Sequence, residues 1–250
     1  MKSALLVGLN YSRTPYALQG CINDVTRMRS LLLANGYLPQ NMTILVDSDA
    51  ARMPTRARIL QELTRLVSTN STELLFLYSG HGSQVRDTNG DEQGGMDSVL
   101  VPCDFQTNGF IVDDDLGQVI RQIQCKCLLL FDSCNSGTVC DLPFSCSYLK
   151  NKTFSLKKNT FVHISNPNIY MMSGCRDNQY SQDVYVNRTY GGAFTNAFLK
   201  NFTTKKSMLT LYADICKSLP ASQQPVFSSS SLAMPQANQP FFSLKKMVFT

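Results

Sequence analysis

The sequence has no run of about 18 or more apolar residues, which excludes a transmembrane helix. Its apolar N-terminal segment is too short for a secretion signal and has no small-residue cleavage site. The nine cysteines contain no Cys-x-x-Cys pair, which argues against a zinc site, and their odd number argues against a disulfide framework. We therefore expect no membrane partner, a cytoplasmic location and reduced thiols.

Charged residues are scarce as well, at 16% of the chain, whereas hydrophobic residues make up 43%. This balance is typical of a globular protein, and 250 residues are enough for one large domain with its own core. The formal net charge is only +5, and the lysine clusters are not interleaved with arginine and aromatic residues. We therefore expect no nucleic-acid partner.

Strand-like and helix-like segments alternate along the first third of the chain. Apolar runs predict strands at residues 3–9, 42–46 and 74–79, and helical spacing predicts helices at 21–35 and 54–67. This alternation predicts an α/β fold with a mostly parallel central sheet flanked by helices on both faces.

The rest of the chain is less regular. Further strands are predicted at 98–102, 127–131 and 169–173, and further helices at 113–123, 191–202 and 207–219. Residues 80–96 are predicted to form a long polar loop, 145–168 an exposed linker, 220–240 a surface loop and 241–249 an edge strand.

Two of the predicted strands end in residues that suit a nucleophile and its base. The run 128–131 leads into Asp132-Ser133-Cys134, and the run 74–79 leads into His81 between two glycines. Parallel sheets present reactive groups at the carboxyl ends of their strands, so these two side chains form a candidate thiolate–imidazole pair. His163, the other of the two histidines, lies in the linker-like segment, and we expect it to be structural or merely exposed.

Acidic residues gather in the segments around these strand ends. They are Asp97, Asp104, Asp113, Asp114, Asp115 and Asp141. One interpretation is that they are helix caps and solvated loop residues. The other is a site for a hard cation, because carboxylates grouped closely would otherwise repel one another.

Several short blocks add up to a family resemblance. They are residues 4–11, 20–24, 78–82, 96–97, 101–104, 131–134, 141–144, 172–175 and 192–195. In content and order they resemble the metacaspases, the caspase-like cysteine peptidases. The resemblance implies a caspase-like sheet in one domain, residues 1–250, with a large-subunit-like part at 1–148, a linker at 149–168 and a small-subunit-like part at 169–250. Since no Pro-rich segment precedes Met1, we expect a type I-like core without its regulatory extension.

The resemblance also implies a function and its residues. It implies a calcium-dependent endopeptidase that cleaves after Arg or Lys. Cys134 would be the nucleophile, His81 would serve the proton transfers, and backbone N–H groups of Gly82 and Cys134 would hold the oxyanion. The acidic S1 pocket would be lined by Cys21, Asp24, Ser79 and Asp132. The activating Ca²⁺ would be bound by Asp97, Asp113, Asp114 and Asp141.

Further expectations concern processing and state. Self-cleavage is predicted at a basic linker residue, with Lys150, Lys152, Lys157 and Lys158 as candidates. We expect a monomer whose partners are protein or peptide substrates. The alternative is a catalytically weak pseudoenzyme that binds calcium or partners. Its main support is Asn135, which stands where the family usually has histidine and which we expect to tune the dyad rather than abolish it.

Overall fold

The computed structural model describes residues 1–87, 95–134, 136–137, 139–149, 151–159, 163–174, 183–186, 189–220, 222–232 and 239–241. The elements in chain order are β1 (Lys2–Gly8), α1 (Cys21–Ala34), η1 (Pro39–Asn41), β2 (Met42–Val46), η2 (Ala50–Arg52), α2 (Arg56–Val67), β3 (Glu73–Ser79), β4 (Gly82–Arg86), β5 (Met96–Leu100), α3 (Phe105–Asn108), β6 (Ile111–Val112), α4 (Asp113–Ile120), β7 (Lys126–Asp132), β8 (Phe144–Tyr148), β9 (Phe154–Lys158), β10 (Ile169–Ser173), β11 (Asp183–Val186), β12 (Thr189–Gly192), α5 (Ala193–Asn201), α6 (Met208–Ser218) and β13 (Val226–Ser229).

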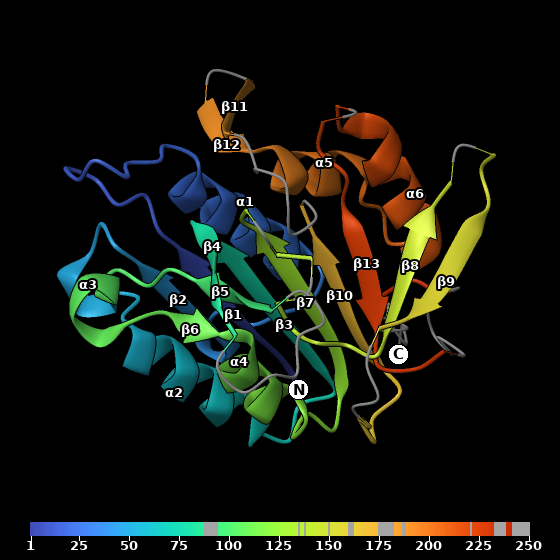
Figure 1. Cartoon of the computed structure of the whole chain (residues 1–250), viewed down its shortest axis with the longest axis horizontal. Coiled ribbons are helices and arrows are strands. Elements are labelled where there is room, and N and C mark those ends of the chain that lie inside the picture. Colours follow the sequence, from blue (N-terminus) through green and yellow to red (C-terminus); the bar gives the residue numbers. More distant parts are fainter. Residues whose placement is uncertain are drawn as a thin grey trace, which may run out of the picture.

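An eight-stranded sheet, in the order β2-β1-β3-β7-β10-β13-β8-β9, forms the centre of the molecule (Figure 1). The pairs from β2 through β10 are all parallel, whereas β13, β8 and β9 are joined by antiparallel pairs. The predicted α/β class with a mostly parallel central sheet is therefore confirmed. The strand order places β3 and β7, the two strands that lead to the candidate histidine and cysteine, side by side.

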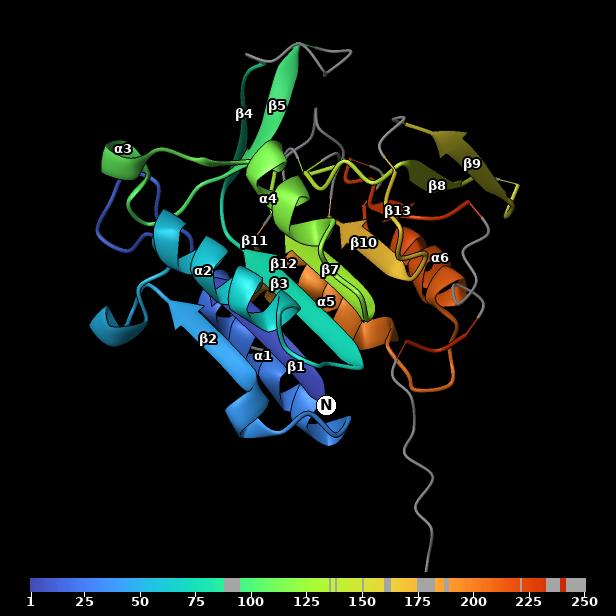
Figure 2. The same cartoon turned by 90° about the horizontal axis from the view of Figure 1, so that it is seen from below.

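Helices cover both faces of this sheet (Figure 2). One face packs on α2 and α4, and its core includes Leu5, Val7, Ile59 and Leu116. The other face packs on α1, α5 and α6, and its core includes Ala4, Leu6, Met28, Phe198 and Leu211. Successive residues of β1 thus enter opposite cores. Burial on both faces is the physical reason for the continuous apolar runs seen in the sequence.

The second half of the chain corrects one prediction. Residues 220–240 were predicted as a surface loop, but β13 lies inside the central sheet between β10 and β8. Phe227 is fully buried and stacks on Tyr170 at a ring distance of 6.1 Å. The serines that made this segment look exposed are satisfied internally, since Ser230 Oγ donates to the Asn166 carbonyl over 2.7 Å. Buried hydroxyls with such partners cost little.

Two further loop predictions need correction. Residues 80–96 hold β4, which pairs with β5 in a separate three-stranded sheet, β4-β5-β6. The linker-like segment 145–168 contains most of β8 and all of β9, which form the hairpin at one edge of the central sheet. All described residues of β9 are exposed, so this edge remains close to the surface. The edge strand predicted at 241–249 lies outside the described residues except for Phe241, which is buried.

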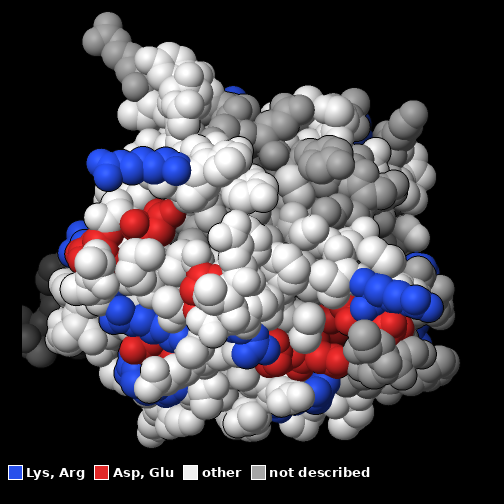
Figure 3. All heavy atoms as spheres, turned by 60° about the vertical axis from the view of Figure 1, so that its left-hand side comes forward, with Lys and Arg blue, Asp and Glu red and all other residues white. Residues whose placement is uncertain are grey.

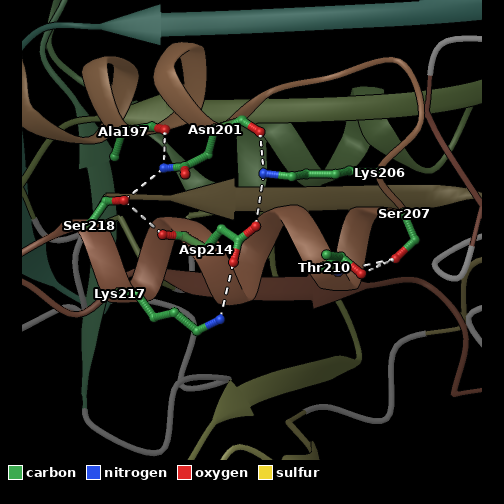
Figure 4. Close-up of polar contacts among 8 residues, drawn as sticks. All are labelled: Ala197, Asn201, Lys206, Ser207, Thr210, Asp214, Lys217 and Ser218. Atoms are coloured by element: carbon green, nitrogen blue, oxygen red, sulfur yellow. Dashed lines mark hydrogen bonds and ion pairs between the residues drawn. The ribbon is translucent and has the colours of Figure 1, made fainter.

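A polar network fixes α5 against α6 (Figure 4). Asn201 Nδ2 donates to the Ala197 carbonyl over 2.9 Å and to Ser218 Oγ over 2.7 Å. Lys206 Nζ donates to the Asn201 carbonyl over 2.8 Å and forms an ion pair with Asp214 over 2.8 Å. The C-terminal turn of α5 is therefore anchored.

The surface view shows acidic and basic side chains side by side on one face, with no continuous basic track across it (Figure 3). In the part of the chain that the structure describes, no helix is long and apolar enough to cross a membrane.

Candidate active site

The candidate dyad lies at the carboxyl ends of two paired strands. Strands β3 and β7 run parallel in a register that sets Ser79 opposite Asp132. His81 and Cys134 follow these residues by two positions each. The backbones of the two segments meet, because a β-carbon on Gly82 would overlap the Cys134 carbonyl oxygen. The fold thus brings the His-Gly and Asp-Ser-Cys segments together, as the sequence predicts.

The His81 ring is oriented by a backbone carbonyl. Its Nε2 lies 2.7 Å from the Tyr16 carbonyl oxygen. A carbonyl can only accept, so Nε2 carries the proton of the neutral ring and Nδ1 is the basic nitrogen. The ring also packs on Tyr11, with centroids 4.8 Å apart. This arrangement leaves Nδ1 as the nitrogen that can exchange a proton in catalysis.

Two buried tyrosines hold the backbone at His81. The His81 N–H donates to the Tyr11 hydroxyl over 3.0 Å, and the Tyr78 hydroxyl donates to the His81 carbonyl over 2.9 Å. Tyr11 also donates to the Val101 carbonyl over 2.6 Å. Burial, more than any other cause, raises the pKa of Tyr11, so its hydroxyl keeps its proton. These hydrogen bonds therefore fix the backbone at His81, just after the end of β3.

Cys134 differs from the other thiols near it in exposure. It is half-buried, whereas Cys127 and Cys140 are buried. Burial raises the pKa of Cys127 and of Cys140 well above the ordinary value. Buried thiols of this kind are poor nucleophiles, because the thiolate is the reactive form. Accessibility thus separates Cys134 from its neighbours. Asn135, which follows it, lies outside the described residues.

The predicted S1 acids form a buried pair beside the dyad. Asp24 is fully buried and Asp132 is 5% exposed. Ser79 Oγ donates to Asp24 over 2.8 Å, and the Gly192 N–H donates to the same carboxylate over 3.0 Å. Thr195, in the first turn of α5, donates its N–H to Asp132 over 2.7 Å. Residues from α1, β3, β7 and α5 therefore meet at one point.

The two carboxylates are close enough to affect each other's ionisation. Burial, and next the negative charge of Asp132, raises the pKa of Asp24 well above its usual value. Gly192 fits against Asp132 only because it has no side chain, since a β-carbon there would overlap the carboxylate. Cys21 begins α1 one turn before Asp24, is buried, and donates its N–H to Asn10 Oδ1 over 3.0 Å. Residues three apart share a helix face, so Cys21 points to the same side as Asp24.

The predicted calcium ligands are placed less closely. Asp97 and Asp113 are both buried. Ser98, the residue after Asp97 in β5, donates its N–H to the Asp113 carboxylate over 2.7 Å. Burial, and next the charges of nearby groups including Asp141 and Asp113, raises the pKa of Cys140, so both acids lie near that thiol. Asp114 follows Asp113 in the first turn of α4.

Carboxylate oxygens are the donors that Ca²⁺ prefers. However, within the described ranges no three acidic, histidine or cysteine side chains are grouped so that they could hold one ion. The donor chemistry of the four aspartates fits calcium, whereas their placement does not form a coordination shell. The calcium site stays a prediction.

Three contacts of this site were not predicted. They involve the carbonyl of Tyr16 and the N–H groups of Gly192 and Thr195. All three are backbone groups, which every residue type other than proline carries, so side-chain patterns do not identify them. The block 192–195 was the available signal, because glycine directly before a helix allows close approach to an N-terminus that favours anions.

Comparisons with known proteins show the family of this chain. A family sequence model described as "Metacaspase, peptidase C14 domain" matches residues 2–143. Metacaspase-1 of Scheffersomyces stipitis is 34% identical over 284 residues, which cover 92% of this chain and 70% of that protein. Metacaspase-1 of Saccharomyces cerevisiae is 32% identical over 286 residues, which cover 92% of this chain and 66% of that protein.

Solved structures support the same fold. A protein from Geobacter sulfurreducens matches with a TM-score of 0.72 at 24% identity, covering 98% of this chain and 99% of that one. Caspase-1 from Spodoptera frugiperda matches with a TM-score of 0.61 at 13% identity, covering 92% and 86%. The resemblance drawn from short sequence blocks is thereby confirmed. The chain belongs to the metacaspase family, with a caspase-like fold, and is a cysteine-type peptidase.

Proposed function

We propose that this peptidase cleaves after Arg or Lys, with Cys134 as nucleophile and His81 as its acid–base partner. The observation that carries the proposal is the buried pair Asp24 and Asp132, since Asp132 lies two residues before the nucleophile. A carboxylate pair so close to the scissile bond would select a cationic side chain in the residue on the acyl side.

The chemistry follows from the two side chains. Cys134 first gives its thiol proton to Nδ1 of His81, and the resulting thiolate attacks the scissile carbonyl carbon, so that an S–C bond forms and the carbonyl oxygen takes the negative charge. His81 then gives a proton to the departing amine as the C–N bond breaks, which leaves a thioester. Water, deprotonated by His81, attacks the thioester and releases the acid product and the thiolate. The ring orientation supports Nδ1 as the nitrogen in both transfers, because Nε2 is held by Tyr16.

The N–H groups of Gly82 and Cys134 are the proposed oxyanion donors. Gly82 lies against the Cys134 backbone, so the two segments are close enough to act on one oxygen. Preorganised donors of this type typically contribute roughly 10²–10³ in kcat each. Their position depends on the backbone contacts that Tyr11 and Tyr78 make at His81.

The P1 preference follows from the cost of burying charge. Two carboxylates that share a buried site cannot both ionise cheaply without a cation. A guanidinium or ammonium group would supply that cation and would be desolvated together with its partners. Removing one member of such a pair typically costs about 2–5 kcal/mol. This range is large enough to set substrate choice.

Calcium dependence is proposed on the four aspartates Asp97, Asp113, Asp114 and Asp141. Their support is donor chemistry and the shared neighbourhood of Asp113 and Asp141 around Cys140. Because the described side chains do not already form a shell, binding would require these acids to draw together. Cys140 and Asp141 follow Cys134 closely in the chain, so such a movement could alter the segment that carries the nucleophile. Weak sites of this kind respond at about 10⁻⁴–10⁻³ M calcium.

Self-processing is proposed for the segment between β8 and β10. Lys152 lies in the turn between β8 and β9 and is exposed, whereas Lys157 and Lys158 lie within β9. A peptidase cannot bind a backbone that is paired in a sheet, so Lys152, which lies outside the β8–β9 ladder, is the best supported candidate. Its turn is closed by the Lys152 N–H, which donates to the Leu149 carbonyl over 2.9 Å, and this turn would have to open for cleavage. Strand β8 runs in the same direction as β7. The turn that follows β8 and the Cys134 segment that follows β7 therefore lie at the same end of the strands, their carboxyl ends. Lys150 lies outside the described residues.

The experiment is an assay with fluorogenic peptides that carry Arg, Lys or Asp at P1, each with calcium and with chelator. We expect turnover of the Arg and Lys peptides, a rise with calcium, and no turnover by Cys134→Ala. Asp113→Asn should lose the calcium response, whereas Asp49→Asn, at an exposed ion pair with Arg52, should keep it. Equal activity in calcium and chelator would remove the metal from the proposal. Absence of Arg and Lys turnover under all conditions would remove the proposed specificity.

A further inference from the structure

A cavity of about 250 Å³ opens directly beside His81. Its lining includes Tyr16, Phe105 and Phe110 together with His81 and Gly82, so aromatic rings face the candidate catalytic groups. Phe105 and Phe110 stack with centroids 5.7 Å apart, and Tyr16 meets Phe105 edge-on at 5.8 Å. Sites for drug-sized ligands are typically ~300–1,000 Å³. This smaller, partly open cavity suits one apolar side chain.

The segment that carries Phe105 and Phe110 is fixed by contacts with Arg56. Arg56, at the start of α2, donates its Nε–H to the Phe110 carbonyl over 2.7 Å and its N–H to Asp104 over 2.8 Å. Its guanidinium also forms an ion pair with Asp115. The segment that carries both phenylalanines is therefore tied to α2 and α4. A cavity whose wall is fixed in this way is preformed, so a bound side chain gains contact without reordering it.

The position of the cavity indicates which part of a substrate it would receive. Asp24 belongs to α1, which packs on the sheet face shared with α5, whereas Phe105, Phe110 and Tyr11 pack with the core of the α2 and α4 face. The acid pair and the aromatic cavity thus lie on opposite sides of the strand ends that carry the dyad. A peptide that crosses these ends would place the side chains flanking its scissile bond on opposite sides.

The role of His81 indicates in which direction, from N- to C-terminus, the peptide crosses the dyad. As the proton donor to the leaving amine, it must lie beside the residue on the amine side of the scissile bond. The cavity is lined by His81 itself, and the acid pair takes the residue on the acyl side. We propose that this cavity is the S1′ subsite and that it selects an apolar side chain, such as Leu or Phe, in the residue following the cleaved bond. The inference rests on the proposed cleavage after Arg or Lys.

The test uses internally quenched peptides that contain one Arg and differ only in the next residue, Gly, Leu, Phe or Asp. Such substrates avoid a coumarin leaving group, which could itself fill the cavity. Burying an apolar side chain predicts that Leu and Phe exceed Gly by roughly tenfold or more in kcat/KM. Phe110→Ala should bring the Leu-to-Gly ratio close to one. Leu38→Ala, which removes an exposed apolar side chain elsewhere, should preserve the ratio.

A second peptide set varies the residue before the Arg, so that a P2 preference is measured separately. Equal kcat/KM for Gly and Leu at P1′, a preference that survives in Phe110→Ala, or selectivity confined to P2 would each overturn the inference. Phe105→Ala replaces Phe110→Ala if the latter does not fold, and the wild-type P1′ profile alone decides if neither folds. Cleavage after Arg without P1′ selectivity rejects only the subsite, whereas no cleavage after Arg rejects the proposed function and the subsite with it.

Discussion

The backbone of Gly82 lies against the carbonyl oxygen of Cys134, so closely that a β-carbon on Gly82 would overlap that oxygen. This contact joins the segment that carries the acid–base histidine to the segment that carries the nucleophile. It explains why a glycine follows His81, since any side chain would force the two strand ends apart. The proposed oxyanion donors belong to these same two residues.

Gly82→Ala should therefore reduce activity by about 100-fold, because a displacement of about 1 Å at the reacting groups has an effect of that size. Overpacking should also lower the free energy of unfolding by roughly 1–3 kcal/mol. The loss of activity is measured by kinetics on an Arg peptide, and the loss of stability by urea unfolding. Gly117→Ala is the matched control, because its β-carbon would meet only the end of the Arg121 side chain. Full activity in Gly82→Ala would show that the contact is not needed.

The two histidines allow a paired test of the dyad. His81→Ala should abolish hydrolysis, as should Cys134→Ala, while both variants keep the wild-type circular dichroism. His163→Ala should retain wild-type activity, because His163 is exposed beside Ile164 and Ser230 rather than at the strand ends. Loss of activity in His163→Ala with retention in His81→Ala would reverse the assignment.

Tyr78 is expected to act by positioning His81. Its hydroxyl donates to the His81 carbonyl and accepts the Val101 N–H over 3.1 Å. Tyr78→Phe removes one hydrogen-bond partner from the His81 carbonyl and one from the Val101 N–H. This should lower the free energy of unfolding by about 1–3 kcal/mol. It should also lower kcat more than it raises KM, because the group held is the acid–base residue rather than the binding pocket. Tyr185→Phe, at an exposed tyrosine, should change neither parameter. An unchanged kcat in Tyr78→Phe would remove it from the positioning network.

Asp24 should make stability fall as pH rises. Burial, with the charge of Asp132 as the second cause, raises its folded-state pKa above the unfolded value of about 3.9. Between these two values the folded protein holds a proton that the unfolded chain has released, so stability is full below the unfolded pKa and declines through the folded one. Asp24→Asn should remove this slope in urea unfolding across the pH range.

Asp214 provides the opposite case and therefore a control. The hydrogen bond from Lys206, first among several causes, lowers its pKa, so its contribution is present above the unfolded pKa and declines as pH falls through the folded one. Asp214→Asn should flatten the acid side of the stability profile and leave the decline assigned to Asp24. A decline in stability above the unfolded pKa that is the same in wild type and Asp24→Asn would contradict the assigned cause.

Much of the fold could be predicted because the central strands are buried on both faces. Strands β1, β3 and β7 appear as apolar runs, since Leu5 and Leu6 enter opposite cores, and the pattern repeats at Phe76 and Leu77. Strand β13 could not be predicted in this way, because buried Ser228 and Ser229 resemble loop residues in sequence. Their burial depends on tertiary partners that a local pattern does not contain.

The same distinction applies to the site. His81 and Cys134 could be chosen from the sequence, because their side chains carry the chemistry and follow recognisable strand ends, whereas Asp24 and Asp132 are assigned through the family resemblance. The Tyr16 carbonyl and the Thr195 N–H could not be chosen in this way, because backbone groups are placed by the fold and are the same in all residues other than proline. The aromatic cavity depends on Phe105 and Phe110, whose approach to His81 follows from the Arg56 contacts rather than from any periodicity.

The most direct test of the account is the ratio of kcat/KM for Arg and Asp at P1, measured in wild type and in Asp132→Asn with calcium present. If the P1 side chain is bound and desolvated between Asp24 and Asp132, the wild-type enzyme should strongly prefer Arg to Asp at P1. Asp132→Asn should reduce Arg turnover by roughly 30-fold to several thousand-fold, the equivalent of about 2–5 kcal/mol. A wild-type profile dominated by Asp at P1, or an Arg turnover that Asp132→Asn leaves unchanged, would contradict the account.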